Sequence, residues 1–341
     1  MKRRLHAEAI LNRSGYEVHN AAGIRALREG RYEIVELTVG GDAPKAFVRV
    51  YEHQSGVARR GRLHKWPAYI AKVGHKWYPN ESITEHLLTR IGEFLGLKMA
   101  ASRLMAAHGQ IRFLSRYFLK KKQTLVHGAQ IFASYLEDEQ FVEEVERARA
   151  AREIFTFQFV EEAIRARFPD ETASLMEAFV RMLAFDAIVG NNDRHHYNWG
   201  VVVHALGAHE PYFAPIYDSA RALFWNFSED RLAARWKNAP SSERDRFLTR
   251  YIENSRPKTG CDGFSNLNHF QLIERLCDHH PSYHTVLVDL YRPDLLKNVS
   301  ALFRTEFRDL FSEQRKEIIL ECLARRLEEY GAIVNPTGTH P

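Results

Sequence analysis

Short segments rich in β-branched and aromatic residues fill the first third of the chain and predict strands. Residues 32–39 and 46–52 carry Val, Ile, Phe and Tyr, and the Gly40-Gly41-Asp42 turn between them predicts a hairpin. Residues 67–73 and 110–118 predict two further strands on the same grounds. The strand-rich part of the chain therefore extends to about residue 118.

Apolar residues at helical spacing follow these strands. Residues 82–95 carry apolar side chains three and four positions apart, and Gly96 predicts the end of that helix. Residues 143–168 and 171–189 predict further helices, and the second is apolar enough to lie in the centre of a core. Residues 23–29 predict one short helix near the start of the chain.

The C-terminal third predicts four more helices, over residues 241–252, 267–277, 283–296 and 312–330. Pro293 falls inside the third of them, so we expect that helix to end or kink before the proline. Strands followed by helices predict an α+β fold with a β-rich first part and a helical second part.

Composition narrows the class of protein without naming it. The chain has 341 residues, of which 45% are hydrophobic and 27% are charged, which is enough for one large or two modest cores. We find neither an apolar run of about 18 residues nor a signal-type start after Met1-Lys2-Arg3-Arg4. We therefore expect a soluble, cytoplasmic protein with no membrane contact.

The cysteine and charge content argue against a disulfide-rich fold, a zinc site and direct binding of nucleic acid. Cys261, Cys277 and Cys322 are too few and too far apart for a disulfide framework, and no zinc-type spacing accompanies Cys277. The net charge of +5 favours an anionic partner without requiring one, and we expect no direct nucleic-acid binding.

Candidate chemistry is concentrated between residues 185 and 218. Phosphoryl transfer needs a carboxylate that orients the attacking hydroxyl and two oxygen ligands that hold Mg²⁺ against nucleotide phosphates. Asp193 and Asn198 have four residues between them, the separation found in the catalytic loop of protein kinases. Residues 199–204 and 212–216 predict a hairpin that returns Asp218 to the same side. We therefore predict Asp193 as the catalytic carboxylate and Asn198 and Asp218 as metal ligands.

The motifs in this stretch resemble those of a known family. Phe185-Asp186, the run Gly190-Asn191-x-Asp193-Arg194-His195-x-x-Asn198, and Pro215-x-Tyr217-Asp218 are similar to the signature of the HipA-like serine/threonine kinases. The resemblance covers about residues 55–275. It implies a two-lobed protein-kinase-like fold, with residues 1–118 as the small lobe and residues 119–341 as the large lobe.

The same resemblance implies cofactors and partners. It implies ATP and Mg²⁺ as cofactors and a protein with a reactive serine or threonine as substrate, for example a translation component. It also implies the toxin of a toxin-antitoxin pair, with a small antitoxin as partner. The D-F-G switch of protein kinases does not occur here, because Asp218 is followed by Ser219-Ala220.

The family pattern also assigns the nucleotide contacts. Lys72 occupies the strand position whose lysine pairs with phosphates, and Glu85 is its expected partner, with Glu81 as the alternative. Ser55, Gly56 and Val57 would form the phosphate loop. The family's Gln and Lys in this loop are Ala58 and Arg60 here, and Ser55 matches a position that some members autophosphorylate. Tyr117, Phe118 and Leu119 would form the adenine-binding hinge.

Two other functions remain open from the sequence. The same fold can phosphorylate a small molecule or a lipid headgroup, and a weak phosphate loop is also expected of an inactive nucleotide-binding or nucleic-acid-binding pseudokinase. The roles of Arg194 and His195 are open as well, because either side chain could orient the loop or contact the substrate.

Overall fold

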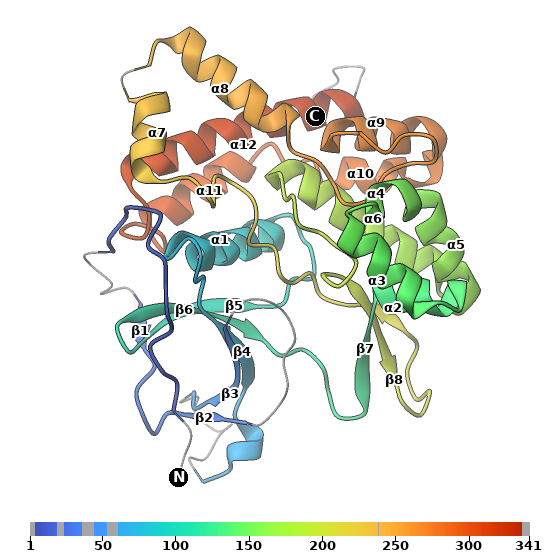
Figure 1. Cartoon of the computed structure of the whole chain (residues 1–341), viewed down its shortest axis with the longest axis horizontal. Helices are drawn as coiled ribbons and strands as arrows, with labels where there is room; N and C mark the ends of the chain where they lie inside the picture. The colour runs from blue at the N-terminus through green and yellow to red at the C-terminus, as the bar shows by residue number, and fades with distance from the viewer. Residues whose placement is uncertain (1–3, 19–23, 36–43, 53–60, 238, 336–341) are drawn as a thin grey trace.

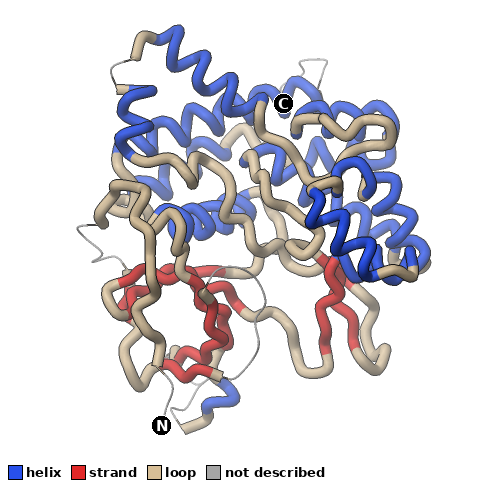
Figure 2. The backbone as a smooth tube through the Cα atoms, in the orientation of Figure 1, coloured by secondary structure: helices blue, strands red, loops and turns tan. Residues whose placement is uncertain are grey.

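The computed structural model describes residues 4–18, 24–35, 44–52, 61–237 and 239–335, which form two lobes (Figure 1). A curled sheet forms the smaller lobe, and helices form most of the larger one. Colouring by secondary structure shows the helices in the upper part of the view and the strands below them (Figure 2). The predicted two-lobed α+β fold is confirmed, while the residue at which one lobe gives way to the other stays a prediction.

Six strands of the small lobe form one sheet in the order β1-β5-β6-β4-β3-β2. Neighbouring strands are antiparallel except β1 and β5, which are parallel. The strands are β1 (Arg25–Ala26), β2 (Tyr32–Ile34), β3 (Lys45–Val50), β4 (Ala68–Lys72), β5 (Ser102–Ala107) and β6 (Gln110–Arg116).

The register of β4 decides which face of the sheet carries Lys72. Side chains alternate along a strand, and Tyr69 and Ala71 belong to the apolar cluster on one face. Lys72 is on the other face, and its partner across the ladder is Phe113 of β6. Phe113 packs in the same core cluster as the helix that follows β4, so Lys72 points toward that helix.

Helix α1 (Asn80–Phe94) covers this face of the sheet (Figure 1). Its apolar side chains at helical spacing, Ile83, Leu87 and Ile91, are fully buried. Gly96 follows the helix with a φ of +76°, a conformation that glycine adopts without steric cost. The predicted helix over residues 82–95 is confirmed.

The large lobe is built around α6 (Thr172–Val189), most of whose residues are buried. Helices α5 (Phe157–Arg167), α9 (His269–His279), α10 (His284–Asp289) and α12 (Glu313–Val334) pack against it. The other helices of this lobe are α2 (Gly128–Leu136), α3 (Glu139–Ala148), α4 (Ala151–Ile154), α7 (Glu229–Trp236), α8 (Ser241–Glu253) and α11 (Leu295–Arg304).

Proline ends one of the predicted helices as expected. The segment predicted over residues 283–296 divides into α10, which ends at Asp289, and α11, which begins at Leu295, with Pro293 between them. Two short 3₁₀ helices, Leu63–Lys65 and Pro281–Tyr283, complete the helical elements of the described residues. None of the helices in this part of the chain has both the length and the apolar character needed to cross a membrane.

A second, three-stranded sheet lies beside the helical lobe, in the order β7-β8-β9. It consists of β7 (Gln123–His127), β8 (Gly200–His204) and β9 (Tyr212–Phe213). Strands β8 and β9 form the predicted hairpin, which leads the chain back toward Asp218. A parallel bridge between Met99 and Ile216 then ties the segment before Asp218 to the chain that enters β5.

One local prediction is wrong, one predicted helix is divided, and several elements were not predicted. The residues from Ile24 to Glu29 form no helix, because Arg25 and Ala26 pair with Met105 and Ala106 of β5. This pairing depends on residues 80 positions away, which a local pattern does not reveal. The helix predicted over residues 143–168 is divided among α3, α4 and α5. Strands β5 and β7, helices α2 and α7 and most of α11 were not predicted.

Candidate active site

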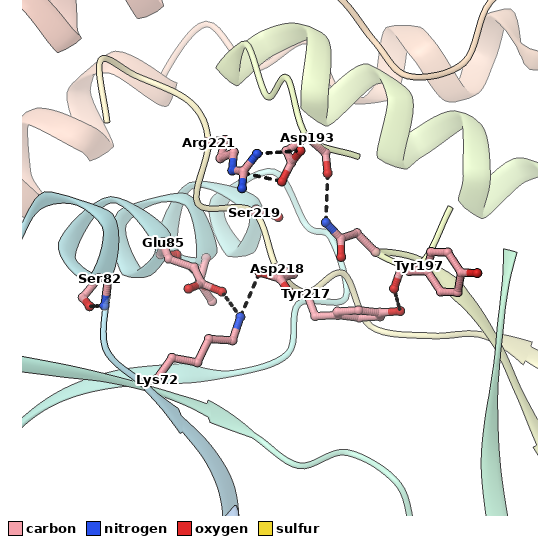
Figure 3. Close-up of polar contacts among 12 residues, drawn as sticks. Lys72, Ser82, Glu85, Asp193, Tyr197, Tyr217, Asp218, Ser219 and Arg221 are labelled. Carbon is pink, nitrogen blue, oxygen red and sulfur yellow. Dashed lines mark hydrogen bonds and ion pairs between the residues drawn. The ribbon is translucent and has the colours of Figure 1, made fainter. Parts of the chain in front are cut away.

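The amino group of Lys72 joins three segments of the chain at one point (Figure 3). Its Nζ donates a hydrogen bond of 2.8 Å to Oε1 of Glu85 on α1 and one of 2.9 Å to Oδ1 of Asp218. Glu81, the alternative partner, instead accepts hydrogen bonds from the backbone N–H groups of Lys76 and Trp77 at the start of the helix. The geometry therefore pairs Lys72 with Glu85.

Burial and mutual charge set the protonation of this group. Burial would lower the pKa of Lys72, but the charges of Asp218 and Glu85 raise that pKa above its ordinary value. Burial opposes ionisation of Asp218 as well, yet the Lys72 ammonium lowers the pKa of this carboxyl to about 2. Burial raises the pKa of Glu85 to about 7, against the attraction of Lys72 and with the repulsion of Asp218. The Lys72 ammonium thus contacts two carboxyl groups, and the one with the lower pKa, Asp218, stays ionised to lower pH than Glu85.

Asp218 has a backbone conformation that favours glycine. Its φ is +53°, in the left-handed region, which costs a residue with a Cβ free energy. The neighbours on both sides are held by Arg194, which donates to the backbone oxygen of Tyr217 at 2.7 Å and to Oγ of Ser219 at 2.7 Å. These contacts fix the conformation that directs the carboxylate of Asp218 toward Lys72.

Arg194 also holds the loop that carries Asp193. Its guanidinium donates to the two carboxylate oxygens of Asp186 at 2.8 and 3.0 Å and to the backbone oxygen of Asn198 at 3.1 Å. Asp186 lies in the last turn of α6, so the loop is anchored to the central helix. Arg194 itself is buried, and its contacts are with Asp186, with the loop and with the residues on either side of Asp218.

Asp193 forms a bidentate ion pair with Arg221, shown by two dashed lines in Figure 3. Nη1 of Arg221 is 3.1 Å from Oδ1 of Asp193, and Nε is 3.1 Å from Oδ2. Burial raises the pKa of Asp193, while the positive charges of Arg221, His195 and Lys258 lower it. Both carboxylate oxygens are therefore engaged in this structure.

Asn198 and Asp218 offer oxygen atoms suited to a hard divalent cation. The amide nitrogen of Asn198 donates to the backbone oxygen of Asp193 at 2.9 Å, which leaves its amide oxygen as the group available to a ligand. Asp218 uses Oδ1 for Lys72, and its side chain is 34% exposed, so its carboxylate remains accessible. Carboxylate and amide oxygens are the ligands that Mg²⁺ takes in nucleotide sites, so this pair fits that ion.

The expected adenine hinge lies beside these residues. The ring of Phe118 is 5.9 Å from that of Tyr217, the residue before Asp218. The backbone N–H of Tyr117 is occupied by the backbone oxygen of Ala68 at 2.9 Å. Phe118 and Leu119 are half-buried, and their backbone N–H groups have no hydrogen-bond partner among the described residues. Of the three hinge candidates, these two have the N–H groups available to a base.

The expected phosphate loop is outside the described residues. Ser55, Gly56 and Val57 fall between His53 and Arg60, so their predicted contacts cannot be compared with the structure. The other predicted site residues gather around Asp218: Lys72, Glu85, Asp193, Asn198 and the hinge.

Two residues of this site had no role in the sequence prediction. Arg221 follows Asp218 by three positions in a segment without regular structure, so no periodicity links it to Asp193. Asn192 was part of a turn motif only, but its side-chain oxygen accepts from Oγ of Ser255 and from the backbone N–H of Arg256. These bonds fasten the Asp193 loop to the segment between α8 and α9.

The fold and the cluster around Asp218 define a protein-kinase-like class, and comparisons with known proteins identify the family. Residues 37–278 match the HipA-like C-terminal domain, so the chain belongs to the HipA-like family. A search of curated protein sequences found no match.

Two solved structures are similar to this chain in fold. The Helicobacter pylori proinflammatory kinase CtkA is 19% identical, with a TM-score of 0.66, over 85% of this chain and 93% of that one. HipA of the Shewanella oneidensis toxin-antitoxin system, in a complex with HipB and operator DNA, is 13% identical, with a TM-score of 0.50, over 89% of this chain and 67% of that one. Both neighbours support the two-lobed kinase-like fold.

Proposed function

We propose that this protein is an ATP- and Mg²⁺-dependent serine/threonine protein kinase of HipA type. The observation that carries the proposal is the double contact of Lys72 with Glu85 and Asp218, at 2.8 and 2.9 Å, beside the Asp193 loop. A lysine held by a helical glutamate next to a metal-binding aspartate is the arrangement that phosphoryl transfer in kinases requires. Membership of the HipA-like family supports the same reaction class.

In this mechanism most of the catalysis is positioning and charge neutralisation. Lys72, oriented by Glu85, binds phosphate oxygens of ATP. Asn198 and Asp218 hold Mg²⁺, which when bound neutralises charge on the phosphates. The backbone of Phe118 and Leu119 contacts the adenine.

Asp193 orients the acceptor hydroxyl and accepts its proton. The oxygen of that hydroxyl forms a bond to the γ-phosphorus while the bond between the γ-phosphorus and the β,γ-bridging oxygen breaks, so ADP leaves. Asp193 makes this contact only when Arg221 no longer holds both of its carboxylate oxygens.

We also propose a separately encoded antitoxin as partner and a translation component as substrate. The HipA neighbour, which is solved with HipB, supports the antitoxin, and only the family resemblance suggests the translation component. Ser55 is a proposed site of autophosphorylation, because it directly precedes Gly56 in the expected phosphate loop.

Incubation with γ-labelled ATP and Mg²⁺ tests the reaction. We expect the protein to label itself or added proteins, and we expect Asp193→Ala and Asp218→Ala each to abolish the label. Asp170→Ala is the matched control, since Asp170 is an exposed aspartate in the turn before α6. Mass spectrometry of the labelled sites then shows whether Ser55 is modified. A protein that neither transfers label nor gains thermal stability from ATP is not a kinase.

A further inference from the structure

The side of Asp193 that is occupied by Arg221 is positively charged. Arg221 holds both oxygens of the carboxylate, and Lys258 and His195 are close enough to lower the pKa of Asp193. Asp218 is the opposing negative group at this position, and its charge is already shared with Lys72. Because Arg221 balances Asp193, the charge of Lys258 remains in excess on this side of the site.

The backbone fixes where Arg221 stands. Its carbonyl oxygen accepts a hydrogen bond of 3.1 Å from the backbone N–H of Asn192, the residue before Asp193. On its other side, Leu223 and Phe224 have φ values of +49° and +62°, and the N–H of Phe224 donates to the hydroxyl of Tyr251 at 2.8 Å. The start of the Arg221 side chain is therefore held beside the loop of Asp193.

The guanidinium lies over the ring of Trp225, 5.4 Å from its centroid, and is partly open to solvent. The side chain of Arg221 is 41% exposed, whereas that of the structural Arg194 is 3% exposed. Solvent weakens an ion pair whose arginine is this exposed, so an incoming carboxylate can replace Asp193 as its partner. Arginine suits this exchange, because its planar fork binds any carboxylate or phosphate through two parallel hydrogen bonds.

We propose that Arg221 selects an acceptor protein in which an acidic side chain flanks the reactive serine or threonine. This inference rests on the proposed kinase function and adds the class of substrate to it. The acidic group of the acceptor takes the guanidinium of Arg221, and Asp193 is thereby released to contact the hydroxyl. Lys258 strengthens the attraction from the neighbouring segment.

A serine-peptide array tests this selectivity. Each peptide has one central serine, and one flanking position at a time is aspartate, alanine or lysine. With γ-labelled ATP and Mg²⁺ we expect the protein to prefer aspartate over alanine by about tenfold at one or more positions, as for a charge-assisted bidentate contact. Arg221→Gln should reduce this ratio to near one, and Arg221→Lys should retain part of it.

Arg181→Gln is the control, because Arg181 is also partly exposed and ion-paired but lies on α6 and pairs with Glu177 and Asp289. It should leave the preference unchanged. A uniform loss of rate for all peptides in Arg221→Gln, or no preference for acidic peptides in the unmodified protein, overturns the inference.

The array, together with thermal stability in ATP, distinguishes failure of the acidic-acceptor proposal from failure of the proposed kinase function. If ATP and Mg²⁺ stabilise the protein but no peptide is labelled, the acidic acceptor is wrong while the nucleotide site stands. If there is neither label nor stabilisation by ATP, the proposed kinase function itself fails.

Discussion

The carboxylate of Asp186 and the guanidinium of Arg194 form a two-bonded ion pair of 2.8 and 3.0 Å in the interior of the large lobe. Both side chains are at least 97% buried, and the same guanidinium donates to the backbone oxygen of Tyr217 and to the hydroxyl of Ser219, on either side of Asp218. The pair therefore connects the end of α6 to the loop that carries Asp193 and to the segment around Asp218.

The first prediction is that Arg194→Met destabilises the fold strongly. The substitution leaves the charge of Asp186 buried with Asn191 as its remaining side-chain partner, so we expect a loss of about 3 to 5 kcal/mol in the free energy of unfolding. Urea denaturation followed by circular dichroism measures the change. Arg181→Gln removes the partly exposed pairs with Glu177 and Asp289 and should cost less than about 1 kcal/mol. Equal losses in the two variants would show that the Arg194 pair is not the anchor.

The second prediction concerns Glu85 and pH. The pKa of Glu85 is raised from 4.5 to about 7 in the folded protein, so the folded state keeps a proton that the unfolded chain releases between these values. Stability from this group is thus present at low pH and is lost as pH rises from about 4.5 to 7.

Glu85→Gln removes this loss, since glutamine does not titrate. We expect the stability difference between the unmodified protein and Glu85→Gln to change by about 1 to 3 kcal/mol across this window, to the disadvantage of the unmodified protein at higher pH. Urea midpoints at both ends of the window test it, and parallel pH profiles for the two proteins would refute the shifted pKa.

The third prediction concerns the acid limb of the activity profile. Asp193 must be ionised to accept a proton, so label transfer should decline as pH falls through its pKa. Burial raises that pKa and Arg221 lowers it, so Arg221→Gln should move the limb to higher pH. Rates of label transfer with a peptide substrate over about pH 5 to 9 measure the shift, and Arg181→Gln should leave it in place. A limb that stays fixed in Arg221→Gln would mean that another group titrates.

The fourth prediction separates packing from chemistry at His196. This residue is fully buried against Phe132, Phe155 and Trp199, and both of its ring nitrogens have no hydrogen-bond partner within the described part of the chain. Burial lowers its pKa to about 3, so the ring is neutral at ordinary pH.

We expect His196→Phe to keep or raise stability, because it removes two unpaired polar atoms and retains the aromatic contacts. His196→Ala should cost about 2 to 4 kcal/mol through the cavity it leaves. Thermal and urea unfolding of both variants compare the two effects. A large loss in His196→Phe would indicate that the ring nitrogens have partners that stabilise the loop.

Local patterns in the sequence predicted the elements whose signals are contained within a few residues. The apolar spacing of α1, the strand that carries Lys72 and the β8-β9 hairpin were predicted in this way, whereas the roles of Lys72 and Glu85 followed from a family motif. The structure brings Lys72 into contact with Glu85 and Asp218, and Asn198 into contact with Asp193. Their catalytic and binding roles remain predictions.

Contacts between distant segments were not predictable in the same way. Strand β1 exists because Arg25 and Ala26 find open backbone groups on β5, and its two residues carry no strand signal of their own. The segment that carries Arg221 to Asp193 has left-handed backbone conformations at Asp218, Leu223 and Phe224. A sequence pattern does not predict this conformation at residues other than glycine. Motifs therefore identified candidate site residues, whereas contacts between distant residues, such as Arg221 with Asp193, are known only from the fold.

The bridge at Ile216 has a mechanical consequence for opening and closing of the two lobes. Its backbone bonds to Lys98 and Ala100, at 2.8 and 2.9 Å, fasten this residue to the small lobe, whereas Arg194 fastens Tyr217 and Ser219 to the large lobe. Ile216 and Tyr217 are consecutive residues, so the chain passes directly from the contacts of one lobe to those of the other at this point. Asp218 is one residue from this junction and both of its neighbours are held by Arg194, so we expect the carboxylate proposed to bind Mg²⁺ to move little when the two lobes move relative to each other.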